Sequence, residues 1–127
     1  MMKKIHTTAA PAAIGPYSQS VAVNGFLFVS GQAPLMPGSG EVVGTTVEEQ
    51  TDRVCRNVQA ILEANGLTLE DVVKTTCFLE DMGDFAAFNA VYERYFTGKP
   101  ARSCVAVREL PKKVLCEVEA IAAFPER

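Results

Sequence analysis

The sequence has a single histidine, His6, and no tryptophan. One imidazole cannot supply a histidine-rich metal site, and a Ser-His-Asp or Cys-His arrangement would have to use this one residue. His6 also lies near the N-terminus, where chains are often loosely held. The sequence therefore argues against a histidine-based metal site and against hydrolysis through an activated serine or cysteine.

The four cysteines lack the spacing of the common thiol motifs. No two of them are separated by two residues, which excludes a zinc ribbon and a thioredoxin-like redox motif. Residues 1–13 contain no apolar run of signal-peptide length, so we expect reduced thiols and a cytoplasmic protein. The ordinary interpretation of each cysteine is a small, buried, apolar side chain. The four are Cys55, Cys77, Cys104 and Cys116.

Charge and hydropathy argue against two further classes of protein. The 12 basic and 15 acidic residues give a net charge of −3, which disfavours a nucleic-acid binder held by a broad basic field. The longest apolar runs, such as residues 120–124, are too short to cross a membrane. With 48% hydrophobic and 21% charged residues, the composition is that of one soluble globular domain spanning residues 1–127.

An Asn-Gly dipeptide at positions 24–25 separates two strand-like runs, residues 17–23 and 26–31. This dipeptide favours a two-residue hairpin turn because both of its residues tolerate positive φ.

The two-residue turn also predicts the register of the hairpin. Val21 should face Phe28, and Gln19 should face Ser30. Because side chains alternate along a strand, Tyr17 then shares a sheet face with Ser30 and lies diagonally across from it, at the open end of the hairpin.

Two helices are predicted from capping signals and apolar spacing. The capping box at residues 46–49 begins a helix of about 18 residues, and Asn65 and Gly66 end it. Asp84 is predicted to cap a second helix, which carries an aromatic stripe typical of core packing and ends near Gly98. Three further strands are predicted at residues 72–79, 102–107 and 114–124.

The resulting order is β-β-α-β-α-β-β, which predicts an α+β fold. Two helices of this length cover one face of a four- or five-stranded mixed sheet and leave the other face bare. We therefore expect the open face to be buried by further copies of the chain in a closed oligomer.

Polar side chains on the last two predicted strands suggest a site. Arg102 and Cys104 share one face, whereas Glu117 and Glu119 interrupt an otherwise apolar strand. We expect the two strands to form a hairpin. If Cys104 faces Glu117 in it, all four side chains share a face, but a register shifted by one separates them. The group is either a structural ion pair or a pocket for a small anion. In the pocket, Arg102 would grip a carboxylate and Glu117 would handle a proton or a water, without metal or histidine.

Six short motifs run along almost the whole chain in order, and together they resemble the reactive intermediate deaminase (RidA/YjgF) family. The motifs are IGPYSQ at 14–19, SGQ at 30–32, DVVKTT at 71–76, FNAVY at 88–92, PARSCV at 100–105 and EVEAIA at 117–122.

The resemblance implies a chorismate-mutase-like fold and a homotrimer with clefts between subunits. It also implies hydrolysis of 2-iminopropanoate, 2-iminobutanoate and their enamine tautomers to 2-keto acids and ammonia. These short-lived compounds are released by pyridoxal-phosphate enzymes, and their hydrolysis requires no cofactor. No nucleic-acid or membrane partner is expected.

The resemblance also implies roles for individual residues. Arg102 occupies the carboxylate-binding position of the family. The backbone carbonyl of Cys104, together with Glu117, would hold and activate the attacking water, so the Cys104 thiol need not be a nucleophile. The remaining pocket positions are Tyr17, Ser30, Gly31 and Asn89.

Two other functions stay open for the sequence. Some relatives have been described as endoribonucleases or translation inhibitors, although the net charge and the lack of a histidine pair argue against this. The chain could instead be a non-catalytic trimer that binds small ligands in the same cleft. The connection at residues 97–99 is shorter than in many members, and because it borders the cleft it leaves the side-chain preference open.

Overall fold

Five β-strands and two α-helices make up the computed structural model over residues 1–126, the part of the chain that it describes. They follow the predicted order. The helices are α1, Val47–Ala64, and α2, Phe85–Tyr95. The strands are β1, Ser20–Val23; β2, Phe26–Gln32; β3, Val72–Leu79; β4, Ala101–Ala106; and β5, Cys116–Ala123.

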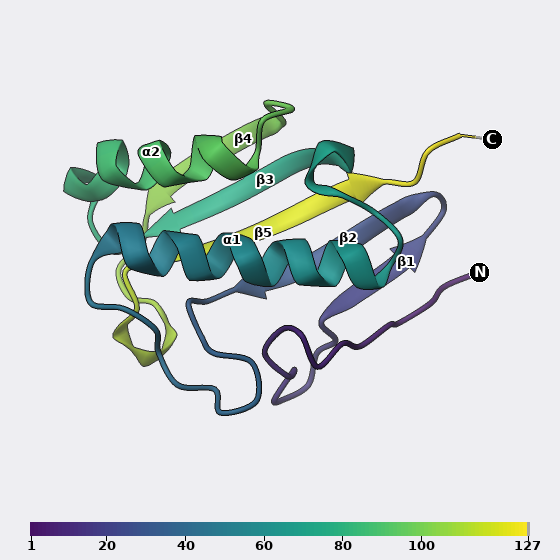
Figure 1. Ribbon diagram of the computed structural model, residues 1–127, viewed down its shortest axis with the longest axis horizontal. Coiled ribbons are helices and arrows are strands. Elements are labelled where there is room, and N and C mark those ends of the chain that lie inside the picture. The colour runs from purple at the N-terminus through teal and green to yellow at the C-terminus, as the bar shows by residue number, and fades with distance from the viewer. Residues whose placement is uncertain (127) are drawn as a thin grey trace.

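The strands form one mixed sheet in the order β1-β2-β5-β3-β4, and both helices lie on the same face of it (Figure 1). β3 and β4 are parallel, whereas the other neighbouring pairs are antiparallel. On β2 the side chains of Leu27 and Val29 are buried under the helices, while Phe26 and Phe28, which point the other way, are 43% and 44% exposed. The predicted fold class, a sheet covered on one face by two helices, is confirmed.

The first hairpin has the predicted turn and register. Val23 pairs with Phe26 across a turn in which Asn24 (φ 52°) and Gly25 (φ 81°) both adopt the left-handed conformation. The backbone N–H of Ser30 donates to the carbonyl of Gln19, the residue predicted to face it, at 2.9 Å. The first strand is shorter than predicted because regular pairing begins only at Ser20.

The two helices differ in how they begin. At the start of α1 the Thr46 hydroxyl accepts from the Glu49 N–H at 3.2 Å, and the Glu49 carboxylate accepts from the Thr46 N–H at 3.1 Å. The predicted capping box is therefore present. Asp84 does occupy the N-cap position of α2, but its side chain makes no capping bond. The neighbouring Asp81 instead accepts from the Gly83 N–H, at 2.7 Å, in the short 3-10 turn Met82–Asp84.

The expected hairpin between the last two strands is wrong. β3 lies between β4 and β5, so Arg102 pairs with Thr75 and not with a residue of the last strand. The physical reason is the helix between β3 and β4: a strand–helix–strand connection of this kind returns parallel to the first strand and beside it. β5 then enters the space between β2 and β3, which the long bend after β4 allows.

The core fills the space between the helices and the covered sheet face. Three of the four cysteines, Cys55, Cys77 and Cys116, are fully buried in it, and Cys104 is partly buried. The expectation that these residues serve as small apolar side chains is met for the three core cysteines.

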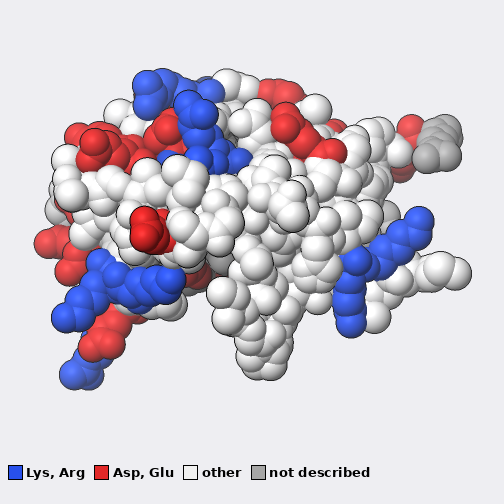
Figure 2. All heavy atoms as spheres, turned by 60° about the horizontal axis from the view of Figure 1, so that its bottom comes forward, with Lys and Arg blue, Asp and Glu red and all other residues white. Residues whose placement is uncertain are grey.

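No helix within residues 1–126 has the length and hydrophobicity needed to span a membrane. On the face shown in Figure 2, basic side chains lie in separate groups, some of them next to acidic ones, with a broad uncharged area between them. This face carries no continuous basic stripe of the kind that tracks a nucleic-acid backbone.

Candidate active site

Arg102 is held on the helix-covered side of the sheet by residues of α2. Its Nη1 donates to Asn89 Oδ1 at 2.6 Å, and its guanidinium carbon lies 4.9 Å from the ring centre of Tyr92 and 5.4 Å from that of Phe85. Because Phe85, Asn89 and Tyr92 are spaced i, i+4 and i+7, they present one helix face to the strand. The two rings and the amide fix the direction of the guanidinium.

The charge of Arg102 is left without a carboxylate partner. In the part of the chain that the structure describes, the salt bridge found joins Arg56 to Asp52, and Arg102 takes part in none. Its hydrogen-bond acceptor, Asn89, is neutral. A cavity of about 310 Å³ opens beside the guanidinium and is bordered by Asn89, Tyr92 and Lys99. Unpaired guanidinium donors beside an open cavity suit the binding of a carboxylate.

Glu117 lies in a second, larger cavity. This cavity of about 470 Å³ is lined by Tyr17, Gly31, Lys112 and Glu117, with an apolar wall that includes Ile14. A Cβ added at Gly31 would lie 3.0 Å from Cδ of Glu117 and would overlap its Oε2. Glycine at position 31 therefore leaves the space that the Glu117 carboxylate occupies.

The surroundings of Glu117 favour its protonated form. Burial of the carboxyl group raises its pKa above the ordinary value of 4.5, and the neighbouring Glu119 raises the pKa further. A raised pKa brings a carboxylate closer to the range in which a general base is most effective at neutral pH.

The two hairpin residues of the predicted site have different surroundings. Tyr17 is 54% exposed and lines the same cavity as Glu117. The hydroxyl of Ser30 donates to the carbonyl of Ser18 at 2.5 Å, so its proton is engaged within the hairpin. Ser30 thus ties the open end of the hairpin together beside Gly31.

Cys104 lies on β4, the edge strand of the sheet, opposite Cys77 of β3. Burial raises the pKa of the Cys104 thiol, and Arg102 lowers it to a lesser extent. The thiol is therefore mostly protonated near neutral pH, which disfavours its use as a nucleophile.

Within one chain, the predicted site residues form two separate groups. Arg102 points toward α2 on the covered face. Glu117 lies between the buried Cys116 and Val118, and because side chains alternate along a strand it points to the open face. Asn89 and Cys104 accompany Arg102, while the hairpin residues accompany Glu117. The structure has neither of the two hairpin registers considered from the sequence, because β3 lies between β4 and β5, and the arginine and the glutamate point to opposite faces of the sheet.

Three residues that contact the site were missed from the sequence. The aromatic stripe of α2 was interpreted as core packing, which holds for Phe88, but Phe85 and Tyr92 also support Arg102. Their spacing around Asn89 was the signal that could have revealed this role. Lys112 lines the larger cavity from a strained backbone conformation (φ 56°), and nothing in its sequence context predicts that position.

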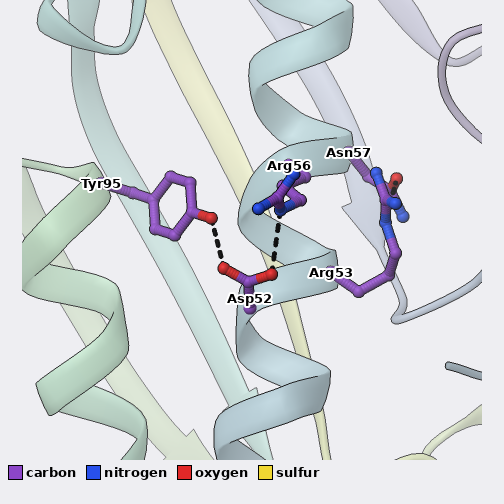
Figure 3. Close-up of polar contacts among 5 residues, drawn as sticks. All are labelled: Asp52, Arg53, Arg56, Asn57 and Tyr95. Carbon is purple, nitrogen blue, oxygen red and sulfur yellow. Dashed lines mark hydrogen bonds and ion pairs between the residues drawn. The ribbon is translucent and has the colours of Figure 1, made fainter. Parts of the chain in front are cut away.

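A polar cluster on the outer side of the helices holds α2 against α1 (Figure 3). The Tyr95 hydroxyl donates to Oδ1 of Asp52, while Arg56 Nε donates to Oδ2 of the same carboxylate at 2.9 Å. These hydrogen bonds and the Arg56 charge lower the pKa of Asp52, even though burial acts in the opposite direction. The cluster therefore joins α1 to α2.

The fold and the sequence both identify the family. The family model described as Endoribonuclease L-PSP, which covers RidA/YjgF proteins, matches residues 7–124. The chain belongs to this family.

Relatives that are similar along their whole length carry several names. An Escherichia coli K12 protein named 2-iminobutanoate/2-iminopropanoate deaminase is 51% identical over 126 residues, which cover 96% of this chain and 98% of that one. A RutC family protein of Pyrococcus abyssi is 54% identical over 119 residues, 93% of this chain and 94% of the other. The solved structure of E. coli TdcF with bound serine superposes with a TM-score of 0.92 at 44% identity, covering 97% of this chain and 99% of that one.

Proposed function

We propose that this protein hydrolyses 2-imino acids, such as 2-iminobutanoate and 2-iminopropanoate, and their enamine tautomers to 2-keto acids and ammonia. The observation that carries the proposal is Arg102, a guanidinium fixed by two rings and a neutral amide beside an open cavity, with no carboxylate paired to it. The name of the E. coli relative supports the same reaction.

The proposed mechanism needs orientation and proton transfer. Arg102 binds the substrate carboxylate, and Glu117 takes a proton from a water that the backbone carbonyl of Cys104 also holds. The water oxygen adds to C2 of the protonated imine and gives a carbinolamine. Glu117 then gives this proton to the nitrogen, and the C–N bond breaks. Ammonia leaves as the keto group forms, and the proton of the carbinolamine hydroxyl passes to Glu117 and from there to ammonia or solvent. A protonated imine is already electrophilic, so we propose that no metal or cofactor takes part.

Because Arg102 and Glu117 point to opposite faces of one sheet, we propose that each site is shared between two copies of the chain in a homotrimer. One copy provides Arg102, Cys104 and Asn89, and the next provides Glu117 with the hairpin residues. The exposed Phe26 and Phe28 on the uncovered face support burial of that face by other copies. The proposed substrates come from pyridoxal-phosphate enzymes, and we propose the cytoplasm as the place where the protein meets them.

The direct test couples a threonine or serine dehydratase to trapping of the imine with semicarbazide. The purified protein should lower the rate of semicarbazone formation, because it removes the imine before the trap reacts. An unchanged rate would rule out the deaminase function. Protein that binds 2-keto acids but leaves the rate unchanged would instead be the non-catalytic ligand binder.

The role of Arg102 has its own test. Arg102→Ala should abolish the effect on semicarbazone formation and leave the oligomer intact by light scattering, because the cation binds substrate and not a neighbouring carboxylate. Retained activity in this variant would remove Arg102 from the mechanism. The family name also invites an assay for RNA cleavage, and cleavage that survives Arg102→Ala would point to a different site or a contaminant.

A further inference from the structure

Tyr92 is fixed at three places around its ring. The ring stacks with that of Phe88, with ring centres 5.6 Å apart, and with that of Phe96, at 4.5 Å. The hydroxyl at the tip of the ring lies 2.6 Å from the hydroxyl of Thr75. Thr75 is fully buried and Tyr92 is 7% exposed, so solvent has little access to either group. The ring therefore has one defined position in the protein.

The same ring supports the guanidinium of Arg102, whose carbon lies 4.9 Å from the ring centre. Thr75 is also the residue that pairs with Arg102 across β3 and β4. The strand position that sets the backbone of Arg102 thus also anchors the ring on which its side chain rests. Thr75, Tyr92 and Arg102 form a closed triangle of one backbone pairing, one hydroxyl–hydroxyl bond and one cation–π contact.

A purely structural role does not require the two hydroxyls. Phenylalanine would fill almost the same volume between Phe88 and Phe96, and valine would replace Thr75 with a similar shape. Burying two hydroxyls costs free energy unless they bond to each other. Burial also raises the pKa of Tyr92 to about 12, so the phenol stays protonated and the bond persists at physiological pH.

We propose that Tyr92, anchored by Thr75, is a positioning residue that holds Arg102 in the orientation in which it binds the carboxylate of the substrate. The inference rests on the proposed function for the identity of the ligand, but the geometry of the triangle does not depend on it. Asn89 accepts a hydrogen bond from one edge of the guanidinium, and the ring of Tyr92 contacts the guanidinium carbon. The remaining N–H groups are left to grip a ligand.

The test compares Tyr92→Phe, which keeps the ring and removes the hydroxyl, with Thr75→Val, which removes the partner. Each variant should weaken binding of the product analogue 2-oxobutanoate about threefold to tenfold, measured by calorimetry, because the ring is no longer anchored. The double variant should bind no more weakly than either single variant, because both act through the same bond.

Tyr95→Phe is the matched control. It removes a hydroxyl from the same helix, the one that bonds to Asp52, and it leaves the surroundings of Arg102 intact. It should lower the melting temperature without changing the affinity for 2-oxobutanoate. A loss of affinity equal to that of Tyr92→Phe would show that any loosening of α2 has the effect, and would overturn the proposal.

A second measurement does not depend on catalysis. In ¹⁵N-arginine-labelled protein, the Arg102 side-chain N–H signal should be displaced by the ring current of Tyr92, and Arg102→Lys identifies that signal by its loss. Tyr92→Phe and Thr75→Val should both shift or broaden it, whereas Tyr95→Phe should not. If neither the signal nor the affinity changes in the two variants, the hydroxyl pair is a core contact only. Failure of the deaminase function would appear separately, as an unchanged semicarbazone rate with the wild-type protein.

Discussion

At the scale of single residues, the arrangement of Glu117 predicts how activity depends on pH. In the proposed mechanism, Glu117 must be ionised in the free protein to accept a proton from water, so kcat/KM should fall as pH decreases through the raised pKa of this group. Glu119 contributes to the increase in pKa as a like charge, and the cation Lys112 lines the same cavity.

Glu119→Gln should therefore shift the acid limb of the pH–rate profile to lower pH. The substitution removes the like charge, the pKa of Glu117 falls toward its ordinary value, and a larger fraction of the enzyme is active in acid. The measurement is kcat/KM across the acid range for both proteins. Glu109→Gln, an acidic residue outside this cavity, is the control and should leave the limb in place. If Glu119→Gln does not move the acid limb, the limb reports the titration of a group other than Glu117.

At the scale of elements, the capping box of α1 involves only neighbouring residues, and its contribution to the free energy of unfolding can be measured with single substitutions. Thr46→Ala removes the hydroxyl that accepts from the Glu49 N–H and should lower the free energy of unfolding by about 1 kcal/mol. Thr46→Ser keeps the hydroxyl and should retain most of the stability. Urea unfolding of both variants measures the difference, and an equal loss in both would mean that the methyl group, and not the cap, is responsible.

The elements also show what could be predicted from the sequence. The Asn-Gly turn and the capping box are signals contained in a few neighbouring residues, and they predicted the hairpin register and the start of α1. The position of β4 beside β3 depends on the helical connection through α2, and no residue near Arg102 or Glu117 in the sequence indicates it. Pairing that is set by topology was therefore predicted wrongly, although every strand was found.

The difference between local signals and pairing set by topology also explains how much of the site could be predicted. The motifs indicated Arg102, Glu117 and the hairpin residues as individual candidates, without their arrangement in space. Which face each side chain takes depends on sheet order, and the support given by Tyr92 depends on how α2 packs. The motif at residues 88–92 indicates that Asn89 and Tyr92 share a helix face, but it does not say which strand residue that face meets.

At the scale of the whole molecule, the proposed shared site predicts complementation between two inactive proteins. Arg102→Ala and Glu117→Gln should each be inactive alone. When the two chains are unfolded together and refolded, or co-expressed, mixed oligomers should regain activity, because Arg102 of one chain and Glu117 of the other form intact sites. The semicarbazide assay measures the recovery. Mixing the two folded variants without subunit exchange is the control, and no recovery in mixed oligomers would place both residues in the same chain's site.

The burial of the thiols has a consequence for the durability of the protein. Burial raises the pKa of Cys77 to about 12 and that of Cys116 to about 11, and it also raises the pKa of Cys55 and of the partly buried Cys104. Electrophiles alkylate thiolates far faster than thiols. Under the proposed function, the protein would therefore offer reactive imines almost no nucleophilic sulfur, and so would resist covalent self-inactivation over many turnovers.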